Sequence, residues 1–99
     1  MNHATRTTLA AVAHRLTAGD VITYHNPVTR TPQTVVLYAA PLRGADGRFY
    51  LIGDSLSGGA QRLVGWQSYR PADEPITTHG RMTVNAHHQN RVLANVTAS

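Results

Sequence analysis

The chain of 99 residues contains no cysteine and no lysine, and only 6% of its residues are aromatic. The absence of cysteine excludes disulfides and thiolate metal ligands, and it favours an intracellular setting. No apolar run approaches the roughly 20 residues needed to cross a bilayer, and the first residues lack the apolar core of a signal peptide. We therefore expect a soluble, unprocessed, cytoplasmic protein with no membrane partner.

The missing lysine means that all nine basic residues are arginine, against five acidic residues, for a net charge of +4. Codon usage in a GC-rich genome explains much of this bias. Guanidinium is also the better group for bidentate contact with phosphate or carboxylate and for stacking on bases. A basic excess favours anionic partners, including nucleic acid, without indicating sequence specificity.

The length predicts a single domain over residues 1–99, with no large internal active-site cavity, because so short a chain buries only about two thirds of its unfolded surface. Alanine is frequent among the apolar residues and contributes little buried area per side chain. Dimerisation would add buried apolar area to a core of this kind. We therefore include a homodimer among the expected assemblies.

An amphipathic helix is predicted over about residues 7–18. Leu9, Val12 and Leu16 recur at helical spacing, and Gly19 provides a left-handed stop. The apolar stripe is narrow, so the helix is expected to lie against a sheet.

Runs of β-branched and aromatic residues, separated by turns rich in glycine and proline, predict about five strands. These strands are expected at residues 20–25, 33–41, 48–54, 61–69 and 81–87. Asp46-Gly47 marks a hairpin between the second and third strands. The strict alternation in the last run predicts a half-buried edge strand, and residues 88–99 then form a tail or a short helix.

The predicted fold is therefore α+β, with an N-terminal helix followed by a small, strongly bent antiparallel sheet. The barrel-like region covers about residues 20–87, and its architecture is similar to the SH3-like small barrels. That similarity concerns the order of elements and the turns, since no sequence signature accompanies it.

Histidine is the only residue type present in numbers that suggest a metal site. His79, His87 and His88 lie in the last quarter of the chain, but neighbouring residues on a strand point to opposite faces. No H-E-x-x-H motif is present, and no cysteine can complete a tetrahedral set. We expect neither a metal nor a cofactor.

One short block is similar to a catalytic motif. Residues 53–56, Gly-Asp-Ser-Leu, resemble the G-D-S-L block of one class of lipases and esterases, in which the serine is the nucleophile. In that family the block lies near the start of a much longer α/β chain, with a D-x-x-H partner far downstream. Both are missing here, so we interpret the block as a strand end and expect no enzymatic activity.

The stretch QRLVGWQSYRP, residues 61–71, combines large aromatic side chains with arginine. A period of two places Arg62, Trp66 and Arg70 on one face. Arg43 and Arg48 flank the neighbouring hairpin. These four arginines form the predicted site for nucleic acid or another anion, with Trp66 either stacking on bases or, as we favour, packing in the core between exposed arginines.

The alternative prediction is a protein interaction module, such as a phage or mobile-element accessory protein that acts on a bacterial host protein. An acidic surface of such a partner would suit the basic chain. The candidate contacts are Trp66, Tyr69, Tyr24 and Arg30, because tyrosine, tryptophan and arginine are enriched in protein interfaces.

Overall fold

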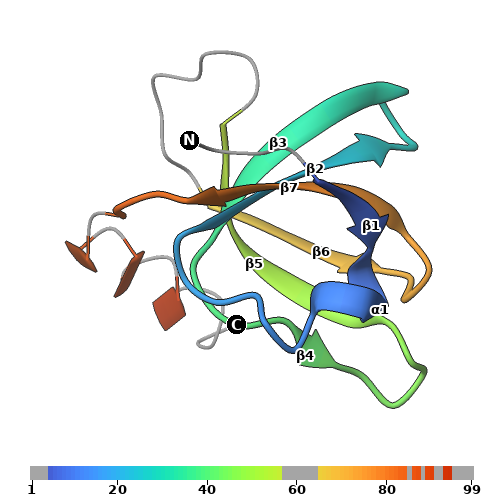
Figure 1. Ribbon diagram of the computed structural model, residues 1–99. Helices are drawn as coiled ribbons and strands as arrows, with labels where there is room; N and C mark the ends of the chain where they lie inside the picture. Colours follow the sequence, from blue (N-terminus) through green and yellow to red (C-terminus); the bar gives the residue numbers. More distant parts are fainter. Residues whose placement is uncertain (1–4, 57–64, 85, 88, 91–92, 95–99) are drawn as a thin grey trace.

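The computed structural model describes residues 5–56, 65–84, 86–87, 89–90 and 93–94. Its main feature is an antiparallel sheet that curls into a half-barrel (Figure 1). The strands are β1 (Thr5–Thr8), β2 (Asp20–Asn26), β3 (Thr31–Leu37), β4 (Leu42–Arg43), β5 (Phe49–Ser55), β6 (Trp66–Arg70) and β7 (Pro75–Arg81). The strand order in the sheet is β1-β7-β2-β3-β5-β4. Both β3 and β4 pair with one edge of β5, and β6 pairs with its opposite edge. The prediction of a small, strongly bent antiparallel sheet is confirmed.

The predicted N-terminal helix is not confirmed at its expected length. Thr5–Thr8 form β1, which pairs with β7, and α1 covers only Leu9–Val12. Threonine is β-branched and loses side-chain freedom in a helix, so a strand partner decides its conformation. The apolar spacing was still informative, because Leu9, Val12 and Leu16 are all buried.

The short helix is held in place by the turn between β6 and β7. The backbone N–H groups of Leu9 and Ala10 have no acceptor within α1, as at every helix start. They donate to the carbonyl oxygens of Glu74 and Ala72, at 2.9 and 2.8 Å. No helix among the described residues is long and apolar enough to cross a membrane.

The predicted edge strand at residues 81–87 is wrong. Among the described residues the last strand is β7, Pro75–Arg81, and it lies between β1 and β2 inside the sheet. Residues 82–84 have no regular structure, and the described residues among 86–94 are helical. Pro75 made the true strand hard to recognise, although proline is tolerated as the first residue of a strand.

The predicted central hairpin is confirmed with a modification. The chain leaves β3 at Leu37, resumes as β4 at Leu42 and returns as β5. Gly44 N–H donates to the Arg48 carbonyl at 2.8 Å, and Gly47 has the positive φ of 85° that the turn requires. The predicted strand at 61–69 corresponds to β6, and residues 57–64 lie outside the described residues.

Each face of the sheet carries an apolar cluster. The main core lies on the inner face, where Leu9 of α1 meets Ile22, Val35, Leu37 and Leu51, all almost completely buried. On the outer face the alternate residues Val36, Tyr38 and Ile52 form a second cluster, against which Val84 and Leu93 pack. The Gln89 side-chain amide donates to the Tyr38 carbonyl at 2.8 Å, so the C-terminal helical residues lie over this second cluster.

Gly53 of β5 lies in close contact with the backbone of β3. It pairs with Leu37 on one side and with Trp66 on the other. A Cβ atom at this position would lie 1.8 Å from the Val36 carbonyl oxygen. Only glycine allows this approach, which brings Trp66 of β6 and the end of β3 to either side of the same residue.

Candidate binding surface

The predicted alternation along β6 is present over its described residues. Trp66, Ser68 and Arg70 are half-buried, whereas Gln67 and Tyr69 are exposed. Trp66 packs against the main core, with its ring centre 5.8 Å from that of Tyr24. The tryptophan therefore lies at the margin of the core and not on an open platform.

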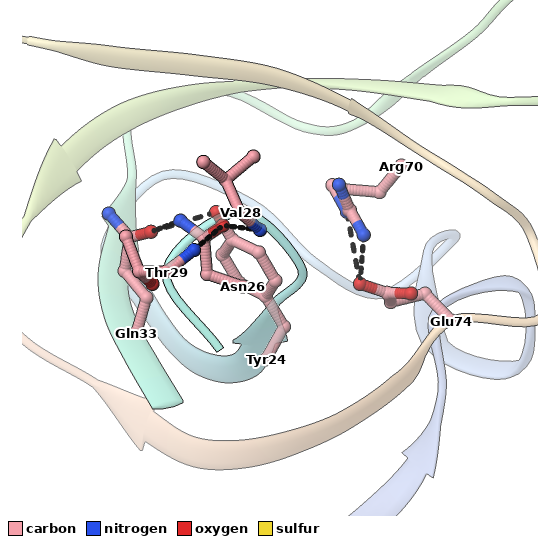
Figure 2. A network of polar contacts seen from close by, with 7 residues as sticks. All are labelled: Tyr24, Asn26, Val28, Thr29, Gln33, Arg70 and Glu74. Carbon is pink, nitrogen blue, oxygen red and sulfur yellow. Dashed lines mark hydrogen bonds and ion pairs between the residues drawn. The ribbon is translucent and has the colours of Figure 1, made fainter. Parts of the chain in front are cut away.

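Arg70 was expected at an exposed end of its strand, and this expectation is wrong. Its Nη2 and Nε atoms lie 2.5 and 3.0 Å from Glu74 Oε1 (Figure 2). The two side chains are only 15% and 12% exposed, and the guanidinium carbon lies 5.0 Å from the centre of the Tyr24 ring. The charge of Arg70 is thus compensated inside the fold.

Tyr24 is likewise part of the interior. Its hydroxyl donates to Gln33 Oε1 at 3.0 Å, and the Asn26 side-chain amide donates to the same oxygen at 2.7 Å (Figure 2). Burial raises the pKa of the Tyr24 hydroxyl above its usual value, and the neighbouring Trp66 side chain and the charge of Arg70 offset only part of this effect. Tyr24 fixes the base of the β2–β3 hairpin and is not a surface contact.

Arg30 is the last residue of the turn that joins β2 to β3. It has a φ of 59°, and its N–H donates to the Asn26 carbonyl at 2.7 Å. The Asn26 side-chain oxygen accepts from the N–H of Val28 at 2.9 Å, which closes the turn (Figure 2). The Arg30 side chain is exposed at this tip, together with Val28.

Arg43 and Arg48 are both exposed on the β4–β5 hairpin. The Arg43 guanidinium carbon lies 5.5 Å from the centre of the Phe49 ring, and Arg43, Phe49 and Arg70 form one row across three strands. Arg48 Nε lies 3.6 Å from Asp46 in a pair that is about 60% exposed on both sides. Arg62, the fourth predicted anion contact, lies outside the described residues.

Tyr69 belongs to an outer aromatic patch that we define as Leu42, Tyr50 and Tyr69. The three residues are aligned across β4, β5 and β6, and the two tyrosine ring centres are 4.8 Å apart. Leu42 is 61% and Tyr69 59% exposed. Leu42 was not among the contact residues predicted from the sequence, although the period of two places it on the face opposite Arg43.

The first three residues of the G-D-S-L block, 53–55, lie in β5. Asp54 is almost completely buried and accepts hydrogen bonds from the Tyr38 hydroxyl and, at 2.8 Å, from the N–H of Gly65. Burial, and then the hydrogen bond with Asp54, raises the pKa of the Tyr38 hydroxyl. Ser55 follows on the opposite face of β5 and receives a 3.2 Å hydrogen bond from the Gln33 amide.

The five acidic residues all lie in the described part of the chain, and most of them are engaged. Asp20 pairs with Arg81 at 3.2 Å, Asp46 with Arg48 and Glu74 with Arg70, while Asp54 is buried against Tyr38. Within the described residues, four exposed arginines have no acidic partner. They are Arg6, Arg15, Arg30 and Arg43.

Among the described residues, no group of three or more histidine, aspartate or glutamate side chains is placed to hold a metal ion. His79 instead contacts the Thr23 hydroxyl, with 2.7 Å between Nε2 and Oγ1. Comparison with known proteins gave no match to any family model, curated protein or solved structure.

Proposed function

We propose that this protein is an intracellular, non-catalytic binding module for an anionic partner, with nucleic acid as the favoured occupant. The observation that carries the proposal is the distribution of charge. Aspartate and glutamate are mostly engaged with Arg48, Arg70, Arg81 or Tyr38. The surplus positive charge therefore falls on exposed guanidinium groups, which suit phosphate oxygens.

The outer aromatic patch supports nucleic acid over a small anion. Bases stack on exposed aromatic side chains, and each such contact contributes roughly 1–3 kcal/mol. Tyr69 presents most of its side chain to solvent beside Tyr50, and Arg48 comes two residues before Tyr50. We also propose that the curled sheet belongs to the SH3-like class of small barrels, in agreement with its short strands and tight hairpins.

The salt dependence of binding tests the proposal. If the four unpaired arginines contact phosphates, the slope of log K against log salt should be near −3. Arg43→Gln should make that slope less steep by about 0.7–0.9. Arg81→Gln removes the same charge but from an arginine paired with Asp20, so it is the matched control and should leave the slope unchanged.

Two results would contradict the proposal. The first is the absence of binding to single- or double-stranded nucleic acid at about 50 mM salt, where electrostatic binding is strong. The second is an equal effect of Arg43→Gln and Arg81→Gln, which would mean that only net charge matters.

A protein partner is the second candidate function, and the outer aromatic patch is the observation that favours it. Leu42 adds an exposed aliphatic side chain that base stacking does not require. An accessory protein acting on a host protein, or a homodimer, would bury this patch. Tyr69→Ala and Leu42→Ala should then shift the sedimentation coefficient of a concentrated sample, whereas Arg43→Gln should not.

A further inference from the structure

A row of polar side chains crosses four strands of the sheet. Arg6 of β1 pairs with Thr77 of β7, Thr77 with Thr23 of β2, and Thr23 with Thr34 of β3. Paired residues in an antiparallel sheet share a face. Because Thr34 alternates with the inner residue Val35, the row lies on the outer face, opposite the main core.

A groove of about 330 Å³ lies along this row. Arg6, Thr77 and His25 all line it, together with Thr23, Pro32 and Pro75. None of the described residues that line it is acidic. The groove therefore combines positive charge with hydroxyl groups and lacks a carboxylate that would repel an anion.

Some side chains of the row have hydrogen-bond donors that can still bind a ligand. Thr23 Oγ1 is 2.7 Å from Thr34 Oγ1 and 2.7 Å from His79 Nε2, so this hydroxyl already has two hydrogen-bond partners. In the part of the chain that the structure describes, the Thr77 hydroxyl and the Arg6 guanidinium have no hydrogen-bond partner. Thr77 is half-buried, which makes an acceptor for its hydroxyl more valuable than it would be in open water.

We propose that this groove binds a phosphate group, and that nucleic acid presents it as a backbone phosphate. The second half of the statement rests on the proposed function. The Arg6 guanidinium offers several N–H donors in a planar fork, Thr77 offers a hydroxyl, and the His25 ring offers an N–H. A tetrahedral phosphate has enough oxygen acceptors to satisfy all three, and charge-assisted bonds of this kind are the strong ones.

Inorganic phosphate tests the groove without any polymer. Titration into the protein should shift the amide resonances of Thr77 and Thr23 and the Arg6 Nε signal, saturably and with millimolar affinity, while chloride at equal ionic strength should not. Arg6→Gln and Thr77→Val should each weaken phosphate binding, by roughly tenfold and threefold. Thr77→Val retains the β-branched shape, and Arg81→Gln is the control of equal charge. The groove assignment is overturned if phosphate produces no localised shift, or if Arg6→Gln and Arg81→Gln weaken binding equally.

A single-stranded oligonucleotide then tests whether nucleic acid presents the phosphate to the groove. It should shift the same resonances, compete with inorganic phosphate and lose affinity in Arg6→Gln and Thr77→Val. If phosphate binds in the groove and the oligonucleotide does not bind at all, the proposed function fails and the phosphate site stands. If the oligonucleotide binds but both variants match the control, the groove assignment fails and the proposed function stands.

Discussion

The ion pair between Arg70 and Glu74 should be a main determinant of stability. Removing one partner of a buried pair typically costs about 3–5 kcal/mol, because the other charge stays buried without compensation. Each side chain keeps slight exposure, at 15% and 12%, so we expect the lower end of that range, about 3 kcal/mol, for Arg70→Met. A domain of this length has a total of only about 5–15 kcal/mol.

Urea denaturation of four proteins measures the pair directly. These are the wild type, Arg70→Met, Glu74→Gln and the double variant. Methionine keeps an apolar stem beside the Tyr24 ring, which the guanidinium now covers at 5.0 Å, and glutamine keeps an acceptor oxygen. The double variant should be more stable than the sum of the single losses predicts, by about 2 kcal/mol, because it leaves no unpaired charge.

Arg48→Met is the matched control, since Arg48 pairs with Asp46 at about 60% exposure and should lose less than about 1 kcal/mol. A loss for Arg70→Met no larger than that of this control would contradict a stabilising role for the buried pair. Arg70 would then behave as a solvated arginine and would be available to a ligand, as the sequence suggested.

Three further outcomes are expected. Gly53→Ala should destabilise by about 3 kcal/mol or more in thermal denaturation, because its Cβ would meet the Val36 carbonyl oxygen at 1.8 Å. Gly44→Ala should cost far less, because a Cβ there would lie 3.1 Å from the exposed Asp46 carboxylate and 3.6 Å from the Arg48 carbonyl oxygen. Trp66→Ala should lose roughly 3 kcal/mol in urea denaturation, since the ring packs on the main core; a variant that keeps its stability and loses only ligand affinity would contradict this. The Tyr38 hydroxyl has a pKa raised above the usual 10.0, so the native state favours its neutral form, and stability should be intact below about pH 10 and fall as the pH rises further. Phenolate absorbance that reaches its full value before the far-ultraviolet signal changes would contradict the last expectation.

The strands that sequence patterns predicted correctly are those whose partners are close in the chain. β2, β3 and β5 carry continuous β-branched and aromatic runs, and an Asp-Gly turn marked the hairpin before β5. The failures involve distant partners. Thr5–Thr8 become a strand only because β7 supplies hydrogen bonds, while the neighbouring Leu9 and Val12 satisfy a helical period equally well.

In the candidate site, too, sequence patterns predicted the features that depend on neighbouring residues and missed those that depend on contacts formed in the folded chain. The period of two correctly placed Trp66 and Arg70 on one side of β6 and Tyr69 on the other. It could not show that Arg70 is paired, because Glu74 reaches it only after the chain reverses at Pro71. The row from Arg6 to Thr34 draws on four strands, so no local pattern contains it.

The pairing of β1 with β7 has a consequence for synthesis of the chain. Thr5 and Thr78 are 73 positions apart, so at about 5–20 residues per second the ribosome needs roughly 4–15 s to supply the second strand after the first. Local hairpins form within microseconds, so β2 and β3 can assemble long before this interval ends. During that time the nascent N-terminal segment has no strand to join, and α1 lacks the carbonyl groups of residues 72 and 74 that receive its first N–H groups. The N-terminal edge of the sheet is therefore completed only after β7 has been translated.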